Sequence, residues 1–209
     1  MSFDYSQASP EELLDHYLEK YRNNNPLAKW LLSNFFKEIG KIVQALNSAD
    51  RILEVGCGPG ESSRQILGML QGQHYEASEY DAGLVDLLNR ANFPVTVTQE
   101  SVYSLNRQDN EFDCVMLLEV LEHLDDYHAA LAEVFRVSKK DVIISVPNEP
   151  LWRILNIARG KYLGQFGNTP GHINHWNVKS LVKLISEFGV CIGVEKTLPW
   201  IVVHARVRG

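Results

Sequence analysis

Three glycines follow an apolar run in the stretch ILEVGCGPGESS, residues 52–63, at positions 56, 58 and 60. Glycine lacks a Cβ atom and tolerates a positive φ angle, so such a loop lets the backbone approach a ligand closely. A dinucleotide, a phosphate group and an adenosyl sulfonium are the candidate ligands, and the spacing of the residues has to distinguish them.

The spacing and charge of this loop disfavour a phosphate-bearing ligand. A dinucleotide fingerprint reads G-x-G-x-x-G and a P-loop needs a lysine, whereas this loop reads G-x-G-x-G without one. Glu54 and Glu61 flank the loop, and their negative charge suits a ligand with a cationic centre. S-adenosylmethionine is such a ligand, because it carries a sulfonium and an amino group but no phosphate. Glu79, at the end of the next expected strand, can accept hydrogen bonds from its ribose hydroxyls.

Histidines that could accept a proton occur in two other stretches. His123 lies in EVLEHL, and His172 and His175 lie in TPGHINHWN. The pKa of histidine suits removal of a proton from a substrate hydroxyl near neutral pH, which makes these three the catalytic candidates. Both stretches also have a structural interpretation, in which His123 hydrogen-bonds to backbone and 169–177 anchors the loop before a helix.

A divalent cation is the remaining alternative for EVLEHL, where Glu119 and Glu122 accompany His123. We expect no metal, because the sequence shows no dense cluster of ligands.

The elements that must position these residues alternate between strands and helices. The patterns predict strands at Ile52–Val55, His74–Glu79, Val95–Thr98, Phe112–Leu118, Asp141–Val146, Val190–Thr197 and Ile201–Val207. They predict helices at 10–21 with a Ser9–Glu12 capping box, from Pro26, at Glu61–Leu70, at Ala82–Asn92, at Asp125–Val137 with Asp125 as cap, and at Asn177–Phe188.

This order predicts an α/β fold, a Rossmann-like three-layer sandwich. Its seven-stranded sheet is mostly parallel, with an antiparallel hairpin formed by the last two strands at one edge. Ligands of such sheets bind beyond the carboxyl ends of the strands, so the glycine loop, Glu79, Ser101 and Glu119 should converge.

Composition limits the class of protein and its partners. The chain has 209 residues, 45% of them hydrophobic, and a net charge of −6, which is typical of a globular protein and disfavours a nucleic-acid substrate. Its three cysteines are isolated, no apolar run could cross a bilayer, and the N-terminus is acidic where a signal peptide is basic. We therefore expect a cytoplasmic protein, and nothing in the sequence specifies its oligomeric state.

The segment 149–167 is a candidate lid. Five apolar residues have helical spacing, and three basic residues lie among them. Such a helix either packs over the active site of a soluble enzyme, which we favour, or lies on an anionic membrane and admits a lipid-linked substrate. The apolar residues are Leu151, Ile154, Leu155, Ala158 and Tyr162, and the basic ones are Arg153, Arg159 and Lys161.

Four stretches resemble the successive motifs of class I S-adenosylmethionine-dependent methyltransferases, especially the small-molecule and quinone-precursor O-methyltransferases. They are ILEVGCGPG, YEASEYD, FDCVMLLEVLEHLDD and VIISVPNEP, and the resemblance is close over residues 50–150. It implies a single domain over 1–209, with an N-terminal helical cap at 1–48, a cofactor-binding core at 50–147, a lid at 148–176 and a C-terminal helix and hairpin at 177–209.

The resemblance also assigns cofactor contacts by position. It implies that Glu54, Gly56, Cys57, Gly58 and Gly60 hold the methionine moiety. Glu79 would bind the ribose and Tyr80 would lie against the adenine, with Ser101 and Val102 lining the adenine pocket and Glu119 at the boundary with the substrate. Ser101 stands where the family commonly has an acid, and Glu100 could substitute for that acid.

The function implied is methyl transfer from S-adenosylmethionine, with S-adenosylhomocysteine as product, to an oxygen of a small molecule or a lipid or glycan precursor. A non-catalytic S-adenosylmethionine-binding partner module is the alternative, and the sequence identifies no acceptor.

Overall fold

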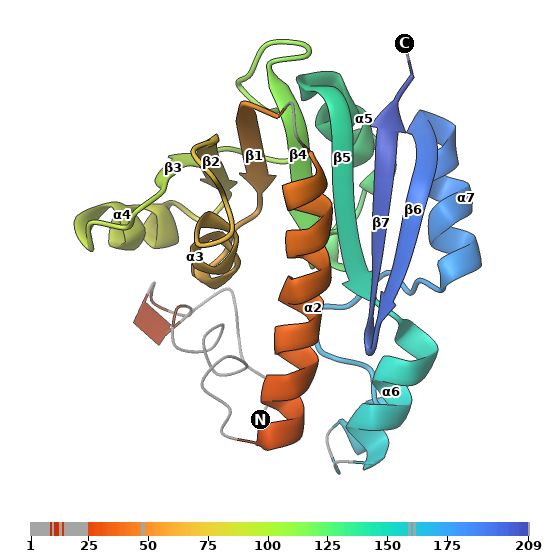
Figure 1. The fold of residues 1–209 in the computed structure, drawn as a ribbon. Helices are drawn as coiled ribbons and strands as arrows, with labels where there is room; N and C mark the ends of the chain where they lie inside the picture. Colours follow the sequence, from red (N-terminus) through yellow and green to blue (C-terminus); the bar gives the residue numbers. More distant parts are fainter. Residues whose placement is uncertain are drawn as a thin grey trace.

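A computed structural model describes residues 25–46, 49–158, 160 and 162–208, together with Ser9, Glu11, Glu12 and Leu14. Seven strands form one sheet in the order β3-β2-β1-β4-β5-β7-β6 (Figure 1). The strands are β1 (Arg51–Val55), β2 (His74–Glu79), β3 (Thr96–Gln99), β4 (Phe112–Leu118), β5 (Ser138–Pro147), β6 (Gly189–Thr197) and β7 (Trp200–Val207).

The pairing confirms the predicted fold class. Strands β3, β2, β1, β4 and β5 are parallel, and β7 is antiparallel to both β5 and β6. The last two strands therefore form an antiparallel hairpin that places β6 at the edge of the sheet.

Helices cover both faces of the sheet. They are α2 (Pro26–Ala45), α3 (Glu61–Leu67), α4 (Ala82–Arg90), α5 (Tyr127–Val137), α6 (Glu149–Ala158) and α7 (Val178–Phe188), with short 3-10 turns η1 (Leu121–His123) and η2 (Leu163–Gln165). In Figure 1, α2 and α3 lie in front of the sheet, whereas α5 lies behind it.

Two apolar cores follow from the alternation of side chains along each strand. On β4, Val115 and Leu117 pack with α5 and α7, whereas Met116 and Leu118 pack with α2, α3 and α4. Both cores fix the carboxyl ends of β1, β2 and β4 at one edge of the sheet, which is where the candidate residues were expected.

Some element boundaries differ from the sequence prediction. Helix α3 ends at Leu67 rather than Leu70, because Gly68 caps it and the next amides bond three residues back, Met69 N–H to Ile66 at 2.8 Å. Helix α5 is capped by Asp126, which accepts from Ala129 N–H at 3.0 Å, so the prediction of Asp125 as cap is wrong.

The predicted helix at 10–21 falls largely outside the described residues. Its capping box is described: Ser9 N–H donates to Glu12 Oε2 at 2.8 Å, and Glu12 N–H donates to Ser9 Oγ at 3.2 Å. The division of the chain into cap, core, lid and C-terminal part stays a prediction.

The candidate lid contains a helix, but its buried face is not the predicted apolar stripe. Asn156 is 1% exposed, whereas Ile154 is 61% exposed. The Asn156 amide and the Trp152 indole donate to Thr169 Oγ1 at 3.2 and 2.8 Å, which ties α6 to the loop before α7. Among the described helices, none combines the length and apolar character needed to cross a bilayer.

Candidate functional site

The glycine loop begins at the end of β1 and is held to the end of β2. The amides of Gly56 and Cys57 both donate to the carbonyl of Ser78, at 2.8 and 3.0 Å. Gly56, Gly58 and Gly60 have φ angles of 74°, 53° and 77°, in the left-handed region that favours glycine.

The three glycines have different surroundings. A Cβ on Gly56 would lie 2.7 Å from Val120 Cγ2, and a Cβ on Gly60 would lie 2.4 Å from Phe93 Cζ. A Cβ on Gly58 would meet no atom of the described residues within 4 Å. Packing therefore disfavours a side chain at positions 56 and 60. At position 58 only the positive φ angle favours glycine, and the space beside the backbone is open.

Glu54 carries a buried carboxylate on β1 beneath the loop. Its side chain is 1% exposed, and Oε2 accepts from the hydroxyls of Ser63 at 2.5 Å and Tyr75 at 2.6 Å. Its other oxygen, Oε1, has no hydrogen-bond partner among the described residues. Burial raises the pKa of this carboxyl, so a cationic group beside Oε1 would stabilise its ionised form. This geometry fits the amino group of S-adenosylmethionine.

Cys57 is a buried, unreactive residue of the same loop. Burial, with the charges of Glu54 and Glu79, raises the pKa of its thiol, and the residue is 3% exposed. A thiol in that environment is protonated and is a poor nucleophile.

Glu79, at the end of β2, is oriented by three backbone amides. Oε2 accepts from Gly58 N–H at 2.8 Å, and Oε1 accepts from Tyr80 N–H at 2.8 Å and Asp81 N–H at 3.0 Å. A carboxylate offers about four lone-pair directions, so acceptor capacity remains for a ligand hydroxyl. Tyr80, the next residue, is 73% exposed, so its ring is accessible for stacking against a purine.

The stretch after β3 differs from one sequence expectation. Ser101 and Val102 are half-buried, and Ser101 Oγ accepts from Tyr103 N–H at 3.3 Å. Glu100 is buried, and both its oxygens accept from Arg107 Nε, at 2.9 and 3.2 Å. This ion pair disfavours the suggestion that Glu100 substitutes for the missing acid.

Glu119 follows β4 with a φ angle of 59°, which is unusual for a residue other than glycine. Its amide donates to the Ser145 carbonyl at 3.1 Å, and its Oε1 accepts from Ser145 Oγ at 3.0 Å. Backbone strain of this kind is concentrated at functional sites. Val120, the next residue, packs on Gly56, so the glycine loop adjoins the turn η1.

Two of the three candidate histidines lie side by side. The rings of His123 and His172 are 5.0 Å apart and nearly perpendicular, at 80°. His123 Nδ1 is 2.9 Å from the Gly171 carbonyl, as the structural interpretation of EVLEHL expects, and His172 Nδ1 is 2.7 Å from Glu149 Oε1. The third histidine is also close, since His175 Nδ1 lies 3.7 Å from the same oxygen.

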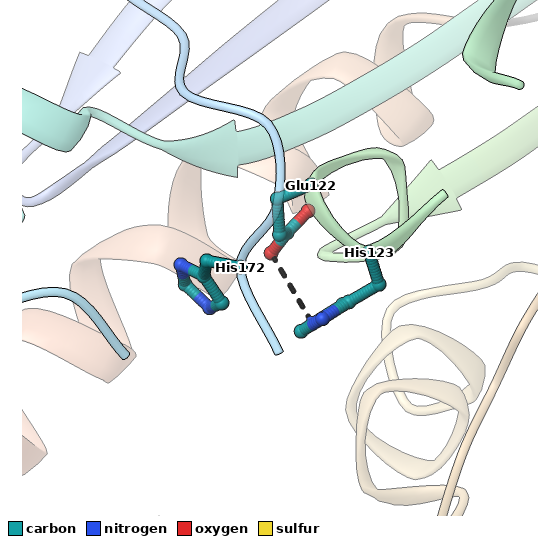
Figure 2. A group of neighbouring side chains, drawn as sticks. All are labelled: Glu122, His123 and His172. Carbon is teal, nitrogen blue, oxygen red and sulfur yellow. Dashed lines mark ion pairs between the residues drawn. The ribbon is translucent and has the colours of Figure 1, made fainter. Parts of the chain in front are cut away.

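Figure 2 shows that Glu122 and His123 on η1 face His172, which lies in the loop before α7. One ligand atom from each of these three residues lies within 4.8 Å of the others. The expectation of no metal rested on the lack of a dense cluster of ligands in the sequence. In the folded chain, however, these three side chains do form a cluster.

Backbone hydrogen bonds hold this loop in place. The amides of Ile173 and Asn174 donate to the Glu122 carbonyl at 3.0 and 3.1 Å. The Asn174 side chain donates to the carbonyls of Leu121 at 3.3 Å and Leu124 at 2.6 Å. These contacts bring His172 to a turn that is far from it in sequence.

Glu149 is the functional candidate that sequence reasoning missed. It is 3% exposed, it contacts two candidate histidines, and its Oε2 has no hydrogen-bond partner among the described residues. The available signal was its place in VPNEP, directly after the buried strand β5 and at the same edge as the glycine loop.

Comparison with known proteins agrees with this geometry. A family model described as a methyltransferase domain matches residues 19–191. An uncharacterized methyltransferase of Schizosaccharomyces pombe is 33% identical over 113 residues, which are 47% of this chain and 39% of that protein. The matched part thus spans about two fifths of that relative's length.

Solved structures share the fold. Magnesium protoporphyrin IX methyltransferase from Synechocystis PCC 6803, with bound S-adenosylhomocysteine, superposes with a TM-score of 0.67 at 15% identity, covering 93% of this chain and 94% of that one. A methyltransferase from Aquifex aeolicus that depends on S-adenosylmethionine has a TM-score of 0.65 at 14% identity, covering 97% and 100%. The family model covers most of the chain, and the chain therefore belongs to the class I S-adenosylmethionine-dependent methyltransferases.

Proposed function

We propose that this protein transfers the methyl group of S-adenosylmethionine to an oxygen of a small molecule or of a lipid or glycan precursor. The observation that carries the proposal is the contact of Gly56 with Val120, which sets the glycine loop beside the turn bearing Glu122 and His123. A cofactor loop and a group of proton-accepting side chains are then neighbours, as transfer to a hydroxyl requires.

The residues proposed to hold the cofactor are those of the loop and the ends of the adjacent strands. Glu54 Oε1 would accept from the amino group, Glu79 from the ribose, and the exposed ring of Tyr80 would cover the adenine, with Ser101, Val102 and Glu119 lining the remainder. S-adenosylmethionine supplies a methyl group already activated by its sulfonium. The task of the protein is alignment, which can supply about 7–11 kcal/mol in favourable intramolecular cases.

His172 is the first candidate for the proton acceptor. If its Nδ1 carries the proton that binds Glu149, then Nε2 carries the lone pair, and the carboxylate stabilises the imidazolium formed on proton uptake. His123 and His175 are the alternatives. A buried histidine–carboxylate pair favours a hydroxyl acceptor over an activated carbon, because a carbon nucleophile needs less help with deprotonation.

A lipid-linked acceptor is a second candidate because of the apolar residues that α6 and η2 expose. Ile154, Leu163 and Phe166 are 61%, 59% and 75% exposed. This surface could lie at a membrane and admit an apolar substrate to the neighbouring site.

The experiment that tests the proposal incubates the protein with methyl-labelled S-adenosylmethionine and a cell extract, then separates aqueous and lipid-soluble products. We expect a labelled product whose carbon-13 shift identifies an oxygen-bound methyl group, formed by wild type and by His128→Ala, an exposed histidine on α5. His172→Ala should lose most of this transfer. Label in the lipid phase would support the second candidate. Cofactor binding without any transfer would support a non-catalytic partner module instead.

A further inference from the structure

We propose that Trp152 is a positioning residue of the methyl-transfer site and that it acts through the imidazole of His172. The inference rests on the proposed function, in which His172 is the first candidate for the proton acceptor. The ring planes of Trp152 and His172 are 25° apart, and their centroids are 6.4 Å apart. Aromatic rings that stack with an offset have centroids about 4.5–7 Å apart, so the indole and the imidazole form such a stack.

One face of helix α6 provides this contact. Glu149, Trp152 and Asn156 are spaced three and four residues apart, which places their side chains on the same side of the helix. Glu149 Oε1 lies 2.7 Å from His172 Nδ1. The Trp152 indole and the Asn156 amide both donate to Thr169 Oγ1, at 2.8 and 3.2 Å. The face that α6 turns toward the loop before α7 is therefore the face that holds the candidate proton acceptor.

Two different contacts are needed to fix an imidazole. The torsion about the Cβ–Cγ bond of histidine has broad minima, so a neighbouring group has to define the plane of the ring. The hydrogen bond with Glu149 fixes the position of Nδ1 of His172, and the stack with Trp152 fixes the plane. Together they hold the Nε2 lone pair in one direction, as removal of a proton from a bound hydroxyl requires.

Thr169 sets the spacing of the two rings. Its hydroxyl accepts from the indole of Trp152, and its carbonyl accepts from the amide of His172 at 3.1 Å. The indole also contacts the ring of Trp200, with centroids 5.8 Å apart, and Trp200 contacts the buried ring of Phe35 on α2 at 4.9 Å. Contacts from the loop, from the start of β7 and, through Trp200, from α2 thus keep Trp152 in place.

Loss of the indole should misplace the imidazole of His172 without removing it. A displacement of about 1 Å can cost about 100-fold in rate, so we expect Trp152→Leu to lower methyl transfer about 10- to 100-fold. The affinity for S-adenosylmethionine should stay that of the wild type, because the glycine loop and Glu79 are unchanged. Trp152→Phe keeps a ring that can stack but loses the N–H group, so it should retain more transfer than Trp152→Leu.

The direct test is nitrogen-15 and proton NMR of the histidine side chains, because it reports the tautomer and the surroundings of His172 without any substrate. The His172 signals are assigned by their loss in His172→Ala. Above neutral pH we expect one tautomer in the wild type, protonated at Nδ1, with a ring-current shift from the indole. Trp152→Leu should lose this shift and average the tautomers, whereas Trp152→Phe and Thr169→Val should keep part of the shift. The matched control Trp30→Leu, at a residue that is 58% exposed on α2, should leave the His172 signals unchanged.

Identical His172 signals in the wild type and in Trp152→Leu would overturn the inference, and so would undiminished methyl transfer by Trp152→Leu. An equal change of these signals in Trp30→Leu would also contradict a specific role of Trp152. Titration with S-adenosylmethionine shows whether each variant is folded. Failure of the proposed function would look different, because the wild type would form no methyl product although its NMR signals still show the stacked ring and the single tautomer.

Discussion

Glu54 combines two features that do not usually occur together, a fully buried carboxylate and an oxygen without a hydrogen-bond partner among the described residues. Such an arrangement costs stability in the free protein and gains interaction energy when a cation arrives. Charge-bearing hydrogen bonds contribute about 1.5–3 kcal/mol.

We therefore expect Glu54→Gln to weaken S-adenosylmethionine binding by about 1.5–3 kcal/mol, roughly 10- to 150-fold, while the free protein remains folded. Calorimetric titration of the two proteins measures the difference. Unchanged affinity would mean that Glu54 does not meet the amino group.

The same residue predicts a pH dependence of stability. Burial raises the pKa of Glu54 above its unfolded value, so the native state holds a proton that the unfolded chain releases. Its stabilising contribution is complete below the unfolded pKa of about 4.3 and is lost as pH rises through the higher folded pKa. Relative to Glu54→Gln, the wild type should therefore lose unfolding free energy across that interval. Urea unfolding at several pH values measures this, and parallel curves for the two proteins would contradict it.

Gly58 gives a matched test of the ligand space. A Cβ added at Gly58 or at Gly72 would lie more than 4 Å from every atom of the described residues beyond its chain neighbours. The φ angle is 53° at Gly58 and 101° at Gly72. Each alanine substitution should cost stability, by about 1–2 kcal/mol at Gly58, whose φ angle is left-handed helical. Only Gly58→Ala should also reduce cofactor affinity, by about tenfold or more, which is 1.4 kcal/mol. Comparable affinities of the two variants would place the ligand elsewhere.

At the scale of elements, the loop before α7 determines whether the histidine cluster exists. Asn174 donates to two carbonyls of the segment around η1. Asn174→Ala should cost about 1–2 kcal/mol for the two hydrogen bonds, and it should release His172 from Glu122 and His123.

Hydrogen exchange over 168–176 should accelerate in Asn174→Ala, and methyl transfer should fall while cofactor affinity is kept. Asn89→Ala, which removes an amide bonded to the Val97 carbonyl at 3.2 Å, is the control and should leave both exchange in that loop and transfer unchanged. Equal protection of the loop in both variants would show that other contacts hold it.

Local signals explain why several elements were predictable. Asn177 and Ser180 form a capping box at the start of α7, and Asn25 with Pro26 marks the start of α2. Helix α6 was less predictable, because its buried residue is polar: Asn156 bonds to the Gly167 carbonyl at 2.9 Å, a partner that only the loop supplies.

The whole molecule should respond to its ligand by mass action. S-adenosylmethionine at 100 times its dissociation constant should add about 2.7 kcal/mol to the free energy of unfolding. For a chain of this size that raises the melting temperature by about 5–11 °C. Differential scanning calorimetry with S-adenosylmethionine, S-adenosylhomocysteine and NAD checks this. A shift with NAD alone would favour an oxidoreductase on the same sheet.

The sequence by itself determined the order of strands and helices, the glycine loop and the acids beside it. These depend on residues close together in the chain: periodicity sets each element, and the turn after β1 needs positive φ angles at its glycines. Glu54, Glu79 and the seven-stranded topology were accessible for that reason.

Only the tertiary structure decided which distant groups meet. His172 reaches η1 through amide contacts with Glu122, and Glu149 turns toward His172 from the end of β5. No local pattern encodes the pairings of His172, because they depend on how the chain after β5 folds back over the carboxyl edge of the sheet.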